Sequence, residues 1–193
     1  CDVVIVHTKA SKCILKGIIN DKKIRIIPHG AYENPKKLNK QTCKRVLGLL
    51  NKKVITIFGF VTKNKAHDLL IDLMPKFNDD VRLVVAGGAR TESDTRYLSF
   101  LKKKVKKFGV QRKVVFLDYI PEEKIPVVLS ATDVAVLPYR NITESGAVHI
   151  ILSHSVPTVT ADLPNFREIK EEFNCVVLFK KDDKDDLFKK VTN

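Results

Sequence analysis

The sequence has no long hydrophobic run, and no stretch approaches the ~18 apolar residues that a membrane-spanning helix needs. Its first residues, Cys1-Asp2-Val3-Val4-Ile5-Val6, also lack a methionine and the basic segment that opens a signal peptide. We therefore interpret this start as a strand entered partway along a longer protein. We expect the chain to be one domain of that protein.

The chain has few cysteines, and no two of them lie at the spacing of a known metal-binding or redox motif. The four, Cys1, Cys13, Cys43 and Cys175, form no C-x-x-C motif, and no histidine lies at metal-ligand spacing from them. This spacing argues against both a disulfide framework and a zinc site. We expect reduced, partly buried thiols, as in a cytosolic protein.

Common catalytic motifs are missing as well. The sequence has no Ser-His-Asp order, no H-E-x-x-H motif and no pair of carboxylates arranged for hydrolysis. It also lacks the phosphate-binding patterns G-x-x-x-x-G-K-[ST] and G-x-G-x-x-G. We therefore assign no catalytic residue and no metal ligand from the sequence.

Acidic residues are outnumbered, because 22 Asp and Glu against 35 Lys and Arg leave a net charge of +13. Such an excess raises nucleic-acid binding as a hypothesis, but the lysines are spread over nearly every segment, and we expect no nucleic-acid partner. The densest run, Lys102-Lys103-Lys104 with Lys106-Lys107, alternates with apolar residues at helical spacing. It predicts an amphipathic helix with a solvated lysine face, and contact of that face with an anionic membrane surface is the alternative.

What is present is the composition of a globular protein, with 44% hydrophobic and 30% charged residues. Short apolar runs alternate with stretches of helical period, which predicts repeated β-α-β units and a parallel sheet. The predicted strands are 3–6, 24–27, 54–58, 81–86, 114–117, 134–137, 158–160 and 176–179. The predicted helices are 11–18, 66–77, 97–108, 122–130, 144–154, 165–172 and 185–191, with a surface loop over 28–41. We expect residues 1–193 to form a single α/β domain with a doubly wound parallel sheet of the Rossmann-like type.

In such a sheet the ligand lies beyond the carboxyl ends of the strands, near the point where the strand order reverses. Gly59 ends one predicted strand, and Lys63 and Lys65 follow it before a helix. Glycine allows close approach of the backbone to a ligand, and a lysine at a helix entrance can neutralise a phosphate. A solvated lysine is the structural alternative.

A second candidate segment follows the strand at 134–137 and opens a helix. Thr143 is a candidate N-cap, and the small residues Ser145-Gly146-Ala147 leave room for an anion at the helix amides. Glu144 would repel a phosphate but suits the hydroxyls of a sugar. Alternatively, Glu144 only favours the helix N-terminus.

Two further segments lie just past predicted strands. His29-Gly30 can form a tight turn that presents the imidazole. Asp118-Tyr119-Ile120 can meet a nucleobase edge and face, and Gly87-Gly88 can line the same pocket. Purely structural roles remain open for both segments.

Together these segments resemble the C-terminal domain of glycosyltransferase family 4, which has the GT-B fold. The resemblance runs nearly the whole length of the chain, and residues 1–8 resemble the strand after the interdomain linker. The matching patterns are "V-I-P-x-G" at 24–30, "G-R-x-x-x-x-K-G-x-x-x-L-L" at 59–70, "L-x-I-x-G-x-G" at 83–88, "A-D-v-x-v-x-P-S" at 131–138 and "G-x-P-V-V-A-T-D" at 156–162.

The resemblance implies the donor half of a retaining glycosyltransferase, which binds a nucleoside-diphosphate sugar. Lys65 matches the family lysine that contacts the diphosphate, and Glu144 matches a glutamate that contacts sugar hydroxyls. Ser145-Gly146-Ala147 match the phosphate-binding helix start, and Tyr119 and Ile120 fall where the base is held.

The resemblance also implies partners and a setting. The acceptor would be held by an N-terminal domain of the same polypeptide, so this half alone would be inactive. No metal or other cofactor is expected. A cytoplasmic location is implied, and a peripheral one at the inner membrane face with a lipid-linked acceptor is compatible with the lysine face.

Three positions depart from the family pattern. Phe60 replaces the arginine that follows the glycine, Leu152 replaces a second glutamate that binds ribose, and Ala66 replaces the glycine after the lysine. Lys63 and Arg140 are candidate substitutes for the missing arginine. Because of these departures, a degenerate, non-catalytic binding module and a sugar-nucleotide epimerase stay open as alternatives.

Overall fold

The computed structural model describes residues 1–193 with the exception of 31–35, 37, 143 and 193. Within these residues the strands form two separate parallel sheets. The strands are β1 Val4–Val6, β2 Ile24–Ile26, β3 Lys53–Phe58, β4 Val81–Ala86, β5 Val114–Phe116, β6 Val134–Leu137, β7 Thr158–Ala161 and β8 Val176–Phe179. The α-helices are α1 Lys9–Leu15, α2 Lys40–Val46, α3 His67–Leu73, α4 Glu92–Lys107, α5 Ile125–Ala131, α6 Gly146–Ser153, α7 Pro164–Phe173 and α8 Lys184–Thr192. Single-turn 3-10 helices lie at Asp21–Lys23, Lys63–Lys65, Met74–Lys76, Gln111–Lys113 and Glu122–Lys124.

The larger sheet has six strands in the order β5-β4-β3-β6-β7-β8. From β3 the chain moves outward through β4 to β5, and it then crosses back to pair β6 with the other side of β3. The strand order therefore reverses between β3 and β6, which is the doubly wound arrangement predicted from the sequence.

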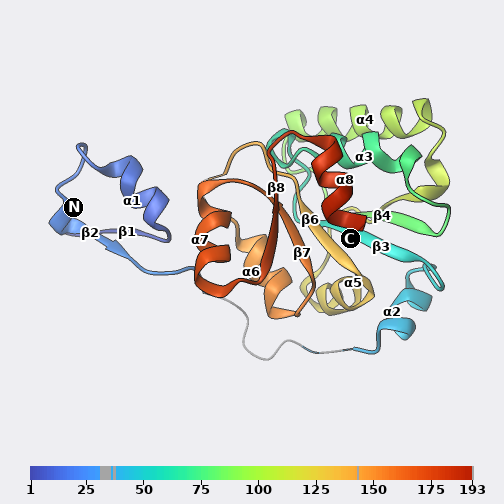
Figure 1. Ribbon diagram of the computed structural model, residues 1–193, viewed down its shortest axis with the longest axis horizontal. Coiled ribbons are helices and arrows are strands. Elements are labelled where there is room, and N and C mark those ends of the chain that lie inside the picture. The colour runs from blue at the N-terminus through green and yellow to red at the C-terminus, as the bar shows by residue number, and fades with distance from the viewer. Residues whose placement is uncertain (31–35, 37, 143, 193) are drawn as a thin grey trace.

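Helices cover both faces of this sheet. In Figure 1, α3, α4 and α8 lie over one face, while α2, α5 and α6 lie over the other. Ile57, Leu83 and Val136, from the three strands β3, β4 and β6, have no exposed surface. Strands buried on both faces must be apolar throughout, which is why they read as continuous hydrophobic runs in the sequence.

The first two strands do not join the larger sheet. β1 and β2 pair in parallel with each other, with α1 between them in the chain, and the unit lies to one side of the larger sheet (Figure 1). The backbone amides of Lys9 and Ala10 donate to the carboxylate of Glu168 on α7, at 2.9 and 2.7 Å. Ile14 and Ile18 are 63% and 76% exposed, so this β1-α1-β2 unit leaves apolar surface uncovered. Residues 1–193, which the sequence predicts to be a single domain, thus contain two sheets. That the two sheets belong to one domain stays a prediction.

Helix α2 is missing from the sequence-based prediction, which extends a loop to residue 41. The structure begins α2 at Lys40, after Asn39, whose side-chain oxygen accepts a hydrogen bond from the amide of Thr42. Asn39 is a favourable N-cap and could have indicated this start. Part of the predicted loop, 31–35 and 37, lies outside the described residues.

Helix α4 begins at Glu92 rather than at the predicted residue 97. Thr91 and Asp94 form a capping box, in which each side chain bonds the backbone of the other. The predicted lysine face also needs correction, because Lys104 is mostly buried and forms an ion pair with Asp72 at 2.6 Å. Lys102 and Lys103 are exposed as expected. Contact of this face with a membrane stays a prediction.

The four cysteines are all free thiols, and Cys43 alone among them is buried. In the part of the chain that the structure describes, each helix is too short or too polar to cross a bilayer.

Candidate functional site

The reversal of strand order brings two predicted segments together. The loop after β3 contains Gly59 and Lys65, and the loop after β6 leads into α6 at Gly146. Since β3 and β6 are parallel neighbours, both loops leave the same edge of the sheet. This is the edge at which open α/β sheets bind ligands.

Close glycine contacts hold the loops after β3, β4 and β5 against one another. A Cβ atom on Gly87 would lie 2.2 Å from the carbonyl oxygen of Gly59, and a Cβ on Gly88 would lie 3.2 Å from the amide nitrogen of Tyr119. The amide of Val61 donates to the carbonyl of Gly88 at 2.9 Å, which extends the pairing past the strand ends. Any larger residue at Gly87 would force these loops apart.

The ammonium group of Lys65 lies inside this edge of the sheet. Its nitrogen is 2.5 Å from the position of a Cβ on Gly59 and 5.6 Å from the ring centroid of the buried Tyr139. Burial lowers the pKa of Lys65 to about 8. No carboxylate among the described residues pairs with it, so this desolvated cation is left without a counter-ion.

The turn that carries Lys65 explains one departure from the family pattern. Ala66 has a left-handed backbone with φ of +50° and is fully buried. Glycine adopts this conformation without strain, which accounts for the glycine of the family pattern at this position. Here alanine adopts it in the same short turn between Lys63–Lys65 and α3.

Helix α6 begins beside Lys65. Its N-cap is Ser145, whose side chain makes no capping hydrogen bond to the helix amides, and a Cβ on Gly59 would lie 3.6 Å from the Cβ of Ala147. Thr143, the cap suggested by the sequence, lies outside the described residues. The Lys65 ammonium and the first turn of α6 therefore lie close together, and an anion bound by both would meet the positive end of the helix dipole.

Glu144 lies just before α6 and faces a row of histidines. Its Oε1 atom is 3.4 Å from Nε2 of His149, and its Oε2 atom is buried without a hydrogen-bond partner among the described residues. Burial acts to raise the pKa of Glu144, but hydrogen bonding to His149 and to the backbone of Ser145, with the nearby histidines, together outweigh it and lower the pKa. The carboxylate is therefore charged at neutral pH, with one oxygen left to accept a hydrogen bond.

The histidine row contains one predicted residue and two that the sequence reasoning missed. His29 stacks on His149 with ring centroids 5.0 Å apart, and His7 meets His29 edge-on at 5.5 Å. The Nε2 atom of His29 lies 3.5 Å from the position of a Cβ on Gly146. These rings line a cavity of about 560 Å³ between the β1-α1-β2 unit on one side and α6 and α7 on the other. Nothing in the local sequence around His7 or His149 indicates this arrangement.

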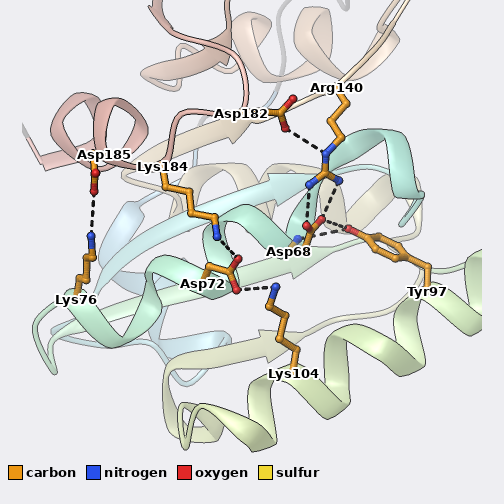
Figure 2. Close-up of polar contacts among 9 residues, drawn as sticks. All are labelled: Asp68, Asp72, Lys76, Tyr97, Lys104, Arg140, Asp182, Lys184 and Asp185. Atoms are coloured by element: carbon orange, nitrogen blue, oxygen red, sulfur yellow. Dashed lines mark hydrogen bonds and ion pairs between the residues drawn. The ribbon is translucent and has the colours of Figure 1, made fainter.

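Arg140 is engaged elsewhere. Its guanidinium forms a two-point ion pair with Asp68, with N–O distances of 3.1 and 2.7 Å, and its Nε donates to Asp182 at 3.2 Å (Figure 2). Its backbone and side chain bond the turn that carries Lys65. Lys63 lies in that turn with an exposed side chain.

Arg90 is a further residue that the sequence reasoning missed. Its guanidinium carbon lies 4.7 Å from the ring centroid of Phe60, the residue that directly follows Gly59. No carboxylate among the described residues pairs with this guanidinium. A basic residue directly after Gly87-Gly88-Ala89 was the only signal in the sequence.

The base-binding candidates lie at the end of β5. Tyr119 is 67% exposed and Ile120 is partly buried, so the tyrosine ring is open to solvent next to Gly88. For metals, the described residues contain no group of three or more His, Cys, Asp or Glu side chains that could hold an ion. The expectation of a metal-free site stays a prediction.

Comparison with known proteins gives one family match. The family described as "Glycosyl transferases group 1" matches residues 39–193, which includes the larger sheet and leaves out the β1-α1-β2 unit. The mannosylfructose-phosphate synthase of Agrobacterium fabrum is 32% identical over 154 residues, covering 72% of this chain and 33% of that protein.

Solved structures share the fold at lower identity. The structure of Anabaena Alr3699/HepE in complex with UDP and glucose has a TM-score of 0.89 at 21% identity, covering 100% of this chain and 53% of that one. The C-terminal domain of a glycosyl transferase group 1 family protein, LpcC of Francisella tularensis, has a TM-score of 0.68 at 22% identity, with 80% of each chain covered. The chain thus spans about a third of its curated relative and about half of HepE.

Proposed function

The chain belongs to the glycosyl transferases group 1, and from this membership we propose that it binds a nucleoside-diphosphate sugar at the carboxyl ends of β3 and β6. In this proposal it is the donor half of a retaining glycosyltransferase. The observation that carries the proposal is Lys65, a desolvated ammonium without a carboxylate partner in the described residues, beside the open first turn of α6.

The diphosphate lies between Lys65 and the start of α6. The amides of Gly146 and Ala147 point toward an anion at a helix N-terminus, and the ammonium supplies a full positive charge from the other side. Because the Lys65 ammonium is largely removed from water, it interacts more strongly with a developing negative charge than a fully hydrated lysine would. The lysine and the helix amides therefore stabilise the diphosphate as it leaves the sugar.

Glu144 and the loop after β5 bind the two ends of the donor. The free Oε2 atom of Glu144 accepts a hydrogen bond from a sugar hydroxyl, and His149 holds the other oxygen. Tyr119 and Ile120 cover the base next to Gly88. UDP-glucose is the first ligand to test, because HepE binds UDP and glucose in the same fold.

Arg90 takes the place of the arginine that Phe60 replaces. A planar guanidinium stacks on an aromatic ring and keeps its in-plane N–H donors free, so Phe60 presents Arg90 rather than displacing it. Arg140 is a poor substitute, since Asp68 and Asp182 already use its donors.

The acceptor is held outside the six-stranded domain. We assign the donor role to residues 39–193, the range of the family match, and group the β1-α1-β2 unit with the acceptor half of the polypeptide. Closure of the two halves brings acceptor and sugar together and excludes water. Transfer with retention, without a metal cofactor and to a lipid-linked acceptor at the cytoplasmic membrane face, completes the proposal.

Calorimetric titration of the chain with UDP-, GDP- and ADP-sugars tests the proposal. One donor should bind saturably, and Lys65→Ala should weaken it about ten- to a hundredfold, because a charge-assisted hydrogen bond contributes roughly 1.5–3 kcal/mol. Lys103→Ala, which removes one exposed lysine charge from α4, is the control and should have little effect. If no donor binds at millimolar concentration, even in the full-length protein, the proposal fails in favour of a non-catalytic binding module.

A further inference from the structure

A polar network lies behind the turn that carries Lys65. Arg140 follows β6, and its guanidinium pairs with Asp68 in the first turn of α3 and with Asp182 in the loop before α8 (Figure 2). The hydroxyl of Tyr97, on α4, donates to the same Asp68 carboxylate at 2.6 Å. Four segments far apart in the sequence thus meet at one carboxylate and one guanidinium.

Arg140 also bonds the Lys65 turn directly. Its backbone amide donates to the carbonyl of Asn64 at 2.8 Å, and its Nη1 donates to the carbonyl of Lys63 at 3.4 Å. Asp68 closes the turn from the other side, since it lies in the helix that begins directly after Ala66. The turn is therefore held to the loop after β6 through both backbone and side chain of one residue.

We propose that Arg140 is a positioning residue that holds the Lys63–Lys65 turn so that the Lys65 ammonium is presented to the anionic part of the ligand. This inference rests on the proposed function for the identity of the ligand. Arg140 itself does not touch the ligand. It acts through the turn. Asp68 holds its guanidinium, and Tyr97 in turn donates a hydrogen bond to Asp68.

The chemistry of the network suits this role. A guanidinium binds a carboxylate at two points in a fixed plane, whereas a lysine ammonium makes no such planar fork. Burial acts to raise the pKa of Asp68, but hydrogen bonds from Arg140 and Tyr97 outweigh it and lower the pKa. The carboxylate therefore stays ionised, and Arg140 keeps its partner across the neutral range.

Lys65 needs such support because no nearby carboxylate holds it. An ammonium that is free to move turns toward water, where its charge is hydrated. The lowered pKa of Lys65, about 8, reflects its removal from water. If the turn loosens, Lys65 becomes hydrated and its pKa rises toward the ordinary value of 10.5.

The test compares Arg140→Lys and Tyr97→Phe with a control on the same helix. Arg140→Lys keeps the positive charge, so a change in the pKa of Lys65 reports geometry rather than charge. Asp72→Asn is the control, because Asp72 lies one turn after Asp68 on α3, is as buried (side chains 15% and 16% exposed), and pairs with Lys104 and Lys184 (Figure 2). The pKa of Lys65 is measured by competitive acetylation across pH with peptide mass spectrometry, and the affinity for UDP-glucose by calorimetry.

We expect Arg140→Lys to raise the pKa of Lys65 by about one unit or more and to weaken donor binding about tenfold, as the loss of a well-placed ammonium predicts. Tyr97→Phe, which keeps every charge and removes one hydroxyl, should shift both values in the same direction by less. Asp72→Asn should lower the melting temperature and leave both values unchanged.

The proposal is overturned if Arg140→Lys and Tyr97→Phe lower only the melting temperature, as Asp72→Asn does, while Lys65 keeps its pKa and the donor its affinity. The acetylation measurement needs no ligand. If the unaltered chain binds no nucleotide sugar, the proposed function fails, and the pKa of Lys65 in the two variants still decides the positioning role. If Arg140→Lys does not fold, the comparison of Tyr97→Phe with Asp72→Asn, in the pKa of Lys65 and in donor affinity, tests the proposal by itself.

Discussion

The ammonium nitrogen of Lys65 lies 2.5 Å from the position that a Cβ atom on Gly59 would occupy. Gly59 also has a φ of +99°, in the region that disfavours any side chain. The absence of a side chain at the end of β3 therefore makes the room that the lysine uses.

Gly59→Ala should consequently displace Lys65 and weaken donor binding about tenfold or more, with a stability cost of about 1 kcal/mol from the backbone strain. Calorimetry gives the affinity and thermal unfolding the stability. Gly109→Ala is the matched control, since Gly109 has a φ of +66° but nothing within 4 Å of a Cβ. It should share the stability cost and leave the affinity unchanged; an equal loss of affinity in both variants would refute the steric explanation.

Donor affinity should fall as the pH rises above 8. The pKa of Lys65 in the free protein is about 8, and a bound diphosphate stabilises the ammonium and raises that pKa. Between the two pKa values the free protein loses a proton that the complex keeps, so the dissociation constant should rise about tenfold per pH unit. Titrations between pH 7 and 9.5 measure this slope. Lys65→Ala should abolish it, and a flat profile in the unaltered chain would count against Lys65.

His67 should make the fold sensitive to acid. Burial first, and the Lys65 charge second, lower the pKa of this fully buried histidine from 6.5 to about 3. In the unfolded chain His67 takes up a proton below pH 6.5, whereas in the folded chain it does not, so its contribution to stability is lost as the pH falls. The slope should be about 1.4 kcal/mol per pH unit within that window.

Denaturant unfolding from pH 7 to 4 tests this expectation. His67→Leu should remove most of the slope, because leucine cannot take up a proton in either state. His154→Leu, a partly buried histidine at the end of α6, is the control and should retain the slope. Identical acid sensitivity in His67→Leu and the unaltered chain would show that other groups dominate.

Arg90→Ala should weaken donor binding about ten- to a hundredfold if its guanidinium bonds the diphosphate. Phe60→Leu should cause a smaller loss, about two- to fivefold, because an exposed cation–π contact contributes roughly 0.5–1 kcal/mol. Calorimetry on both variants measures these effects. Arg112→Ala removes the same charge from the 3-10 turn before β5 and should have little effect. A loss as large in Arg112→Ala would indicate a general effect of net charge.

The strands were predictable because their signal is local. Three of them, Val81–Ala86, Val134–Leu137 and Val176–Phe179, have the predicted bounds, since each is a short, mostly apolar run that can be recognised from neighbouring residues alone. Two helix starts were mispredicted although the sequence contains their N-caps. The prediction did not take the N-caps Asn39 and Thr91 into account, so it omitted α2 and the first turns of α4.

Part of the candidate site was also predictable. Gly59, Lys65 and Gly146 follow strands in the sequence, and parallel strands deliver their carboxyl ends to one edge, where the structure brings these residues together. The substitute for the missing arginine was not predictable in this way. Arg140 was a candidate substitute because it follows a strand, yet its guanidinium bonds Asp68, which lies 72 residues away in the chain.

The sequence by itself determined the strands and most of the helices, the doubly wound sheet, the family and the edge of the sheet proposed for the ligand, because each depends on periodicity and on residues close together in the chain. The tertiary structure decided which cations are free. Arg140 is paired, Arg90 lies on Phe60, and Lys65 is partly buried without a carboxylate partner in the described residues. It also decided that β1 and β2 form their own sheet. The partner of a charged side chain, like the partner of a strand, depends on distances between residues that are remote in sequence, and only the folded chain sets those distances.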